Sequence, residues 1–500
     1  MSRKNGGIIG PANTPVGGLI TGVAGGVWRM NDVANFVGNS QWPKVPENID
    51  NSLRFNDGSS DYLSKTFGTA TNRKKWTFSA WIKRSNPTSS GETIFSALSE
   101  DSTSWYSRLA DNGDGKFDFT EYSGSAYTIN LRPNALQRDS SAWYHFVLMY
   151  DSAQSTSSDR VKYYINGTQI TSWATETYPS QNQESGINKN HLHTIGKTTE
   201  TSGMYYDGYM AEVVFIDGQA LDPTSFGEFD TTTGIWKPKK IGQIANAGTN
   251  SFYLNFKDSS NVGKDESGNS NNFTVNNLTS IDQSTDTCVE NFVTMNPLNL
   301  YQYNFTFSEG NLKVANSSSN WHAASGTIGI NKGKWYYEAK YTGSSNLQHW
   351  CVGYGGEAQN ATDATRNSVF FYNNDGGEIY TSDVSNTTTT QADYGTFSQN
   401  DIIGIALDYD NEYISVYKNG SAIVTNYDYG ATSYSSNLKD GKTIFPYVAH
   451  YASGDITLNF GNPPYSISSG NSDANGFGNF EYSVPSGYYA LNTSNLNTYG

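Results

Sequence analysis

The sequence predicts an all-β protein, and three features of its composition support this prediction. The 500 residues include 35 Tyr, 24 Phe and 11 Trp but only 16% charged side chains, and aromatic residues favour strands. The 49 Gly, with many Ser, Thr and Asn, are typical of tight turns. Runs rich in Ala, Leu, Glu and Lys, which would indicate helices, are missing.

Residues 1–48 form a Gly-, Pro- and Asn-rich segment without a strand or helix period. Such a segment cannot bury enough apolar surface to fold alone, so we expect an extended arm that orders against a partner subunit, with a plain linker as the alternative. A basic start followed by apolar residues imitates a secretory signal, but Pro11, Asn13 and Pro15 interrupt it. We therefore expect no signal peptide. The apolar side chains that would need cover are Ile8, Ile9, Leu19, Ile20, Val23, Val27 and Trp28.

Short alternating segments begin at Ser52 and continue to about residue 221. In WTFSAWIKR (76–84), alternation places Trp76, Phe78, Ala80 and Ile82 on one face. Many short strands with turn signals between them indicate a β-sandwich or jelly roll. This first sandwich is predicted over 49–228.

The pattern weakens over 229–300, which we interpret as a connecting segment, although 251–258 has the character of a strand that closes the first sandwich. Alternation resumes in GKWYYEAKY (333–341) and predicts a second sandwich over 301–462. Residues 463–500 are then a C-terminal tail. The expected fold is two tandem antiparallel jelly-roll sandwiches behind an N-terminal arm.

Two similar stretches, VKYYINGTQI (161–170) and ISVYKNGSAI (414–423), share Tyr, Asn, Gly and Ile in register. Asn-Gly between alternating residues predicts a two-residue hairpin turn, because both residues accept a positive φ. Each hairpin follows another strand, so each copy predicts a three-strand meander. Sequence identity between the two stretches disappears outside the hairpin. This favours two separate sandwiches that use the same type of hairpin over a recent duplication.

These segments also carry resemblances to known families. Through WTFSAWIKR, WYHFVLMYD, VKYYINGTQI and GYMAEVVFIDGQALDP, residues 52–221 resemble a laminin-G-like, concanavalin A-like lectin/glucanase sandwich. Through GKWYYEAKY, IIGIALDYDNEYISVYKNG, IFPYVAH and ITLNFG, residues 305–461 resemble a SPRY domain. Both resemblances imply jelly-roll folds of related architecture.

The whole chain further resembles structural proteins of tailed, particularly marine, bacteriophages. The segments that carry this resemblance are GGIIGPANTP, LDPTSFGEFDTTTGIWKPKKI, DQSTDTCVENFVTMNPLN and PSGYYALNTSNLN, although family members often have Pro where this chain has Cys288. The resemblance implies a virion component that docks to other virion proteins through its arm and is made in the host cytoplasm.

Enzymatic motifs are incomplete. A laminarinase-type Glu-x-Asp-x-x-Glu strand is approached by Glu228 and Asp230, but Thr233 stands at the second catalytic position, and the nearby Pro and Gly favour a loop. We therefore expect a non-enzymatic protein without a catalytic residue or cofactor.

Metal motifs are equally incomplete. His191 and His193 have a spacing that can bind metal but is more often one strand face. DNGDGKFDF (111–119) has Gly113 where a calcium ligand is required and predicts a turn. No metal site is assigned. For the loop that contains Asp258 and Asp265, two alternatives remain: a calcium site and a solvated loop without a metal.

The formal charge of −15 disfavours nucleic acid and anionic membrane surfaces as partners. The sequence contains no continuous apolar run of ~18 residues, so we expect no membrane span. The two cysteines, Cys288 and Cys351, lie too far apart in sequence for a compact Cys-x-x-Cys site and are expected to be small buried side chains.

Aromatic side chains near predicted strand ends are the candidate ligand-binding residues, because sugar faces stack on Trp and Tyr. The hypothesis is a homo-oligomeric tail fibre, appendage or surface adhesin that binds host-surface glycans; the alternatives are a purely structural capsid decoration or tail scaffold and, less favoured, a glycan-degrading enzyme. The candidate residues are Trp105, Tyr106, Tyr205, Tyr206, Trp321, His322, Tyr372 and Asn373.

Overall fold

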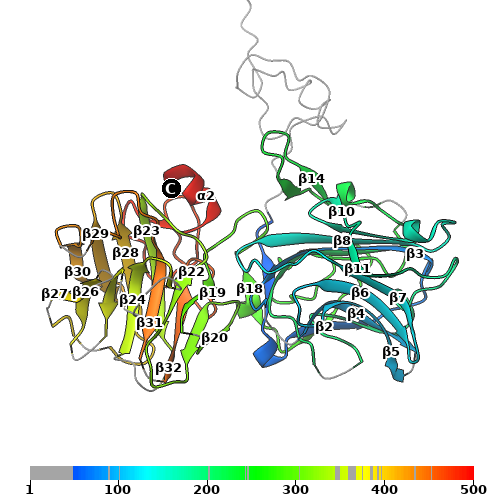
Figure 1. Cartoon of the computed structure of the whole chain (residues 1–500), viewed down its shortest axis with the longest axis horizontal. Coiled ribbons are helices and arrows are strands. Elements are labelled where there is room, and N and C mark those ends of the chain that lie inside the picture. Colours follow the sequence, from blue (N-terminus) through cyan, green and yellow to red (C-terminus); the bar gives the residue numbers. More distant parts are fainter. Residues whose placement is uncertain are drawn as a thin grey trace, which may run out of the picture.

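Two β-sandwiches joined by a short connection make up the described part of the protein (Figure 1). The computed structural model describes residues 49–87, 91–100, 102–200, 203–241, 244, 247–302, 304–343, 349–358, 367–373, 376–382, 387–390, 393–395, 397–432, 435–451 and 453–500. The arm predicted over 1–48 lies outside these residues. No helix among them is long and apolar enough to cross a membrane.

The first sandwich consists of two large antiparallel sheets. One has the order β10 (Thr168–Gln169), β9 (Val161–Ile165), β8 (Trp143–Asp151), β3 (Lys75–Arg84), β13 (Gly208–Asp217), β1 (Ser52–Phe55) and β18 (Gln283–Ser284), with β16 (Phe252–Leu254) paired to β13. The other has the order β11 (Trp173–Thr177), β7 (Tyr127–Pro133), β6 (Phe117–Ser123), β5 (Ser102–Asp111), β4 (Glu92–Glu100), β12 (Leu192–Ile195), β2 (Tyr62–Thr66) and β17 (Thr274–Asn276). A separate hairpin of β14 (Gly227–Phe229) and β15 (Trp236–Pro238) packs beside it.

The second sandwich has the same two-sheet construction. One sheet has the order β19 (Met295–Tyr301), β22 (His322–Gly326), β31 (Phe445–His450), β24 (Trp350–Gly355), β25 (Ser368–Tyr372), β26 (Glu378–Ser382) and β27 (Thr387–Thr390). The other has the order β20 (Phe305–Ser308), β21 (Lys313–Asn316), β32 (Gly454–Asn459), β23 (Lys334–Tyr341), β28 (Ile402–Asp408), β29 (Tyr413–Lys418) and β30 (Ser421–Asp428), with β33 (Tyr489–Ala490) parallel to β23.

Helical structure in the described residues is confined to short segments. These are η1 (Asp57–Ser59), η2 (Ser157–Asp159), η3 (Pro223–Ser225), η4 (Ser280–Asp282) and α2 (Thr493–Tyr499). The prediction of an all-β protein with two tandem antiparallel sandwiches is confirmed.

Alternation along the strands places the cores as expected. Trp76, Phe78, Ala80 and Ile82 of β3 belong to the buried core of the first sandwich. Trp335, Tyr337, Ala339 and Tyr341 of β23 occupy the same position in the second.

The opposite face of β23 is also covered, by residues of the C-terminal segment. Glu338 accepts hydrogen bonds from the backbone N–H groups of Glu481 (3.0 Å) and Tyr482 (2.8 Å), and Tyr336 packs edge-on against Phe480. The C-terminal segment is therefore part of the second sandwich's packing.

Both predicted hairpins are confirmed. Asn166 and Gly167 join β9 to β10 with φ values of 48° and 73°, and Asn419 and Gly420 join β29 to β30 with 49° and 79°. The structure also explains why Asn is used. Asn166 Oδ1 accepts from the backbone N–H of His145 at 2.8 Å, and Asn419 Oδ1 makes the equivalent bond to Ile402 at 2.9 Å. Each turn is thus tied to the first strand of its meander.

Replacing Gly167 with alanine is expected to destabilise the protein by about 2–3 kcal/mol. A left-handed backbone costs an L-residue about 1–2 kcal/mol, and an added Cβ would also overlap the Trp236 ring. Urea unfolding measures the loss. Gly234→Ala is the matched control, since Gly234 has φ +71 and no atom within 4 Å of an added Cβ. Equal losses in the two variants would show that Trp236 moves aside at no cost.

Most of the predicted connecting segment 229–300 is tied into the first sandwich, whereas its last residues form the start of β19 in the second sandwich. Strand β16 pairs with β13, β17 with β2, and β18 with β1. The two sandwiches also contact each other directly: Tyr209 Oη donates to the Gly310 carbonyl (2.9 Å), and Asn311 Nδ2 donates to the Ser85 carbonyl (2.7 Å).

Candidate binding pocket

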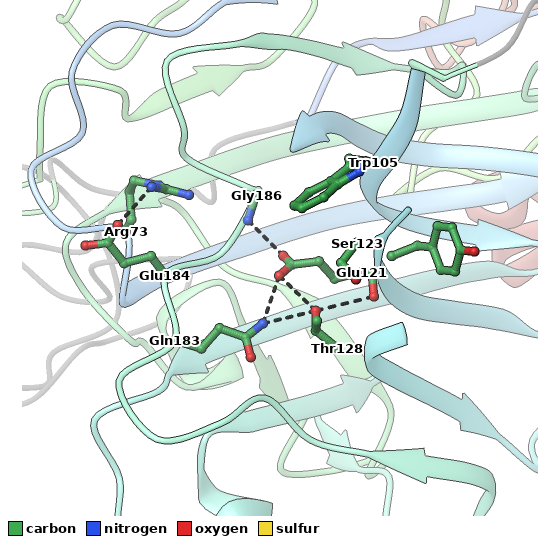
Figure 2. A pocket seen from close by; sticks show the side chains of 9 residues that line it. Arg73, Trp105, Glu121, Ser123, Thr128, Gln183, Glu184 and Gly186 are labelled. Atoms are coloured by element: carbon green, nitrogen blue, oxygen red, sulfur yellow. Dashed lines mark hydrogen bonds and ion pairs between the residues drawn. The ribbon is translucent and has the colours of Figure 1, made fainter. Parts of the chain in front are cut away.

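A pocket of about 200 Å³ lies at the rim of the first sandwich. Strands β5 and β6 contribute Trp105 and Glu121 from their ends, and residues 183–186 close the opposite side (Figure 2). Since strand ends and loops at a sandwich rim escape the packing of the core, side chains there are available to contact a ligand.

The floor of the pocket is Glu121, which is only 6% exposed. One carboxylate oxygen accepts from Thr128 Oγ1 (3.2 Å) and Gln183 Nε2 (2.9 Å). The other accepts from Ser107 Oγ (2.6 Å), Ser185 Oγ (3.1 Å) and the N–H of Gly186 (2.8 Å). Five donors hold this carboxylate, so the floor is a rigid polar network.

One wall of the pocket is Trp105, which is 38% exposed despite its size. Gly124 lies under the indole with φ +78, and a Cβ at that position would overlap the ring. Glycine is therefore needed for Trp105 to hold this position.

The opposite wall is the ion pair between Arg73 Nη1 and Glu184 Oε2 at 2.9 Å. Arg73 also donates to the Ser185 carbonyl from Nε (3.1 Å) and Nη2 (2.6 Å), so this rim is fixed as well. A flat aromatic wall above a polar floor suits a ligand with one apolar face and several hydroxyl groups.

The other aromatic candidates of the first sandwich lie apart from this pocket. Tyr106 points from the other face of β5, where its ring stacks near Tyr122 and under the Arg108 guanidinium, 4.5 Å away. Tyr205 is partly buried beside Lys197. Tyr206 is fully buried and donates to the Lys83 carbonyl at 2.9 Å, so its proposed contact with a ligand is corrected to a structural hydrogen bond.

In the second sandwich the structure brings two candidates together. The rings of Trp321 and Tyr372 lie 5.9 Å apart, and Tyr451 packs 5.8 Å from Trp321. The remaining two are buried, contrary to the expectation of exposed ligand contacts: His322 is bonded to Ser318 Oγ at 2.6 Å, and Asn373 donates its N–H to the Trp350 carbonyl. The eight candidates therefore do not form one site.

The Glu228–Asp230 motif forms part of a hairpin instead of the predicted loop. Glu228 lies in β14, and both carboxylates face Lys237 Nζ, at 3.6 Å and 3.1 Å. Three N–H and O–H groups of the turn bond to Asp230 and lower its pKa. Its role is to close a turn.

The metal motifs of the sequence are likewise built into the fold. The ring of His193 is buried against Phe67, and Asp111 accepts from the N–H groups of the turn over 113–115. Asp258 pairs with Lys264 at 3.4 Å, and Asp265 accepts from the N–H groups of Tyr253, Ser267 and Asn271. These partners leave little room for calcium in the 257–269 loop.

Sequence reasoning found Trp105 but missed Glu121, Gln183 and Arg73. A signal was present for Glu121, because it follows Phe117 and Phe119 at the inward positions of β6. A charged residue at an inward position implies a polar cluster at the end of a core.

Two family models match the chain. Residues 57–225 match the concanavalin A-like lectin/glucanases superfamily, and residues 334–463 match the SPRY domain. The first matched range lies in the first sandwich and the second in the second sandwich, and each covers less than half of the chain. Similarity to a superfamily that contains lectins supports a binding role.

Solved structures with similar regions include the SPRY domain of human HERC1, at 16% identity over 33% of this chain and 96% of that chain, with a TM-score of 0.27. Domains LG4-5 of the mouse laminin alpha1 chain match at 10% identity over 83% of this chain and 91% of that chain, with a TM-score of 0.29. No curated protein matches the chain.

Proposed function

We propose that the protein is a non-enzymatic adhesin of a tailed bacteriophage particle that binds host-surface glycans through the Trp105 pocket. The observation that carries this proposal is the exposed indole of Trp105 beside the rigid Glu121 network. A pyranose ring would stack on the indole, and its hydroxyl groups would bond to the polar rim. The lectin-like family of the domain is consistent with this use.

The virion position of the protein rests on its resemblance to phage structural proteins. Residues 1–48 would dock the chain to other virion proteins, and several copies would assemble because an apolar Gly-rich arm is best covered jointly. Weak sites repeated on one particle combine through effective concentration, so each pocket needs only modest affinity. Peptide mass spectrometry of gradient-purified particles tests this part; absence of the chain from the particles would contradict it.

Replacing Trp105 with alanine is expected to weaken glycan binding by about five- to thirtyfold, since a stacked aromatic contributes roughly 1–2 kcal/mol. The full chain and its variants are compared on a glycan array. Tyr451→Ala is the matched control, because Tyr451 is equally exposed at 38% but lies in the second sandwich.

Glu121→Gln supplies a second variant of the same pocket. This variant keeps the shape of the pocket floor but loses the carboxylate that accepts from five donors, so glycan binding should weaken. Glycan binding by the control Tyr451→Ala should equal that of the wild type. If the wild-type chain binds no glycan but still assembles on particles, the structural alternative of a decoration or scaffold protein is favoured instead.

A further inference from the structure

A buried lysine contacts the segment that connects the two sandwiches. Lys83 lies near the end of β3 and is only 1% exposed, although lysine is rarely buried to this extent. Its Nζ donates to Asp286 Oδ2 (2.7 Å), to Asn291 Oδ1 (2.7 Å) and to the Phe292 carbonyl (3.2 Å). All three acceptors lie between β18 and β19, where the chain passes from one sandwich to the other (Figure 1).

The side-chain amide of Asn291 is held in one orientation. Its oxygen faces the Lys83 ammonium group, which can only donate, and its Nδ2 donates at 2.6 Å to the Ser141 carbonyl, which can only accept. The amide carbon lies one C=O bond, about 1.2 Å, beyond the oxygen, so Nζ is at most about 3.9 Å from this carbon. Reacting atoms are typically about 3–3.5 Å apart before a bond forms, and this pair is close to that separation.

Asp286 supplies an acid–base group beside the amine. Its side chain is fully buried, its Oδ2 contacts Lys83 Nζ, and its Oδ1 accepts from the indole N–H of Trp143 at 3.1 Å. Burial raises the pKa of Asp286, although Lys83 acts in the opposite direction. A general acid–base group must lie within about 2.6–3.2 Å of the atom whose proton it moves, and Asp286 meets this requirement at Nζ.

We propose that Lys83 and Asn291 join in an isopeptide bond, with Asp286 as the acid–base group. Asp286 takes one proton from the Lys83 ammonium, and the neutral amine attacks Asn291 Cγ. A C–N bond forms, and the π electrons of the carbonyl move to Oδ1. The reaction is an amide exchange within one chain.

The second half of the reaction releases ammonia. In the tetrahedral intermediate, Nζ and the leaving Nδ2 are bonded to the same carbon, so Asp286 can donate its proton to Nδ2 and take another from Nζ. The carbonyl then re-forms and the Cγ–Nδ2 bond breaks. The products are a secondary amide between Lys83 and Asn291, a protonated Asp286 and one ammonia, and no oxidant or further reactant is needed.

The surroundings favour this outcome. The Lys83–Asp286 ion pair is buried, at 1% and 0% side-chain exposure, and buried charges are costly. The reaction replaces both charges with neutral groups. Exclusion of water also protects the new amide from hydrolysis, while the half-buried Asn291 leaves a way out for ammonia.

The bond would fasten the connection between the sandwiches to the first sandwich. Lys83 and Asn291 are 208 positions apart, and a cross-link between distant residues stabilises a protein by restricting its unfolded chain. The C-terminal helix α2 is attached to the same point, because Asn291 N donates to Thr493 Oγ1 (3.0 Å) and Thr493 N donates to the Asn291 carbonyl (3.0 Å). One bond would thus hold β3 to the connection on which α2 is anchored.

Mass spectrometry of the purified full chain tests the proposal. We expect the intact chain to be lighter than its sequence by one ammonia. Trypsin should give residues 76–84 joined to residues 265–313, because it does not cleave after a lysine whose side chain is an amide. A succinimide at an Asn-Gly turn would also lose ammonia, but it would leave residues 76–83 as a free peptide. Release of the free 76–83 peptide without any joined peptide would overturn the proposal.

Two variants assign the roles. Asn291→Ala keeps the Lys83–Asp286 pair but has no amide to attack, so it should have its calculated mass and melt several degrees below wild type. Asp286→Asn, with its folding checked by circular dichroism, cannot carry the proton, so the yield of joined peptide should fall at least tenfold. Asn134→Ala is the control with the same chemical change at an exposed amide, and its yield should equal that of wild type. A joined peptide in Asn291→Ala, or an undiminished yield in Asp286→Asn, would contradict the assigned chemistry.

Discussion

Replacing Arg84 with methionine is expected to destabilise the first sandwich by about 3–5 kcal/mol. Arg84 is fully buried, and its guanidinium donates from Nε to Glu92 (2.9 Å), from Nη2 to Asp111 (2.8 Å) and from Nη1 to the Gln137 carbonyl (2.9 Å). Without it, two buried carboxylates lose the guanidinium that they share. Urea unfolding followed by tryptophan fluorescence measures the loss.

Most of this destabilisation comes from burying Glu92 and Asp111 without the Arg84 guanidinium, and less of it from the lost packing of the Arg84 side chain. Two further variants separate these two causes. Arg138→Met removes an exposed guanidinium that donates to the Asp114 carbonyl, and a change within about 0.5 kcal/mol is expected. Adding Glu92→Gln and Asp111→Asn to Arg84→Met should recover part of the stability. A loss below about 1 kcal/mol in Arg84→Met alone would show that the two carboxylates are protonated or reached by water.

Local sequence patterns predicted the strands and turns well. The Asn-Gly hairpins formed as expected because their requirement, two positive φ angles, involves only neighbouring residues. Alternation in β3 identified the core face, because that face is fixed by the period of the strand itself.

What covers the opposite face of a sheet could not be predicted, because it depends on contacts distant in sequence. Trp81 on the outer face of β3 is buried near Trp236 of the β14–β15 hairpin and near Cys288. Glu338 is buried by backbone donors more than 140 residues away in the sequence. Neither the β14–β15 hairpin nor the C-terminal segment has a sequence pattern that predicts its packing on a sheet face.

The candidate site was only partly predictable for the same reason. Trp105 and Tyr206 are both aromatic residues near strand ends, yet one is exposed and the other is fully buried with its hydroxyl on the Lys83 carbonyl. The Glu121 floor is assembled from the neighbouring strands β5 and β6 and from the loop at 183–186, whose Gly186 lies 65 positions away from Glu121 in the sequence. Spacing alone cannot reveal such an assembly.

Lowering the pH from 7.5 to 5 is expected to cost about 4 kcal/mol of stability through His145 and His193. Burial lowers the pKa of each to about 3, from 6.5 in an exposed chain. Above pH 6.5 both rings are neutral in the folded and unfolded states. Between pH 6.5 and 3 only the unfolded state takes up the protons, so stability falls as the pH falls, by about 1.4 kcal/mol per pH unit for each ring. Urea unfolding at a series of pH values measures the slope.

The hydrogen bonds of the two rings also disfavour the uptake of a second proton. The indole N–H of Trp236 can only donate, so His145 Nδ1 accepts from it (3.0 Å) and Nε2 carries the proton that is donated to Ser79 Oγ (2.8 Å). His193 has the reverse arrangement. Its Nδ1 donates to the His191 carbonyl (3.0 Å), and its Nε2 accepts from the N–H of Asn188 (3.1 Å). Protonation would break an accepting bond in each case.

Buried carboxyl groups change the stability with pH in the opposite direction to the histidines. Their contribution must therefore be separated from that of His145 and His193. Asp61 and Asp118 have pKa values raised to about 6 and about 7, so the folded state takes up their protons first and gains stability as the pH falls. The double variant His145→Gln/His193→Gln keeps a neutral donor and acceptor at each position but cannot titrate. Wild type minus this variant therefore isolates the histidine contribution, which should grow steadily from pH 6.5 downward. Parallel curves for the two proteins would show that the rings are protonated in the folded state.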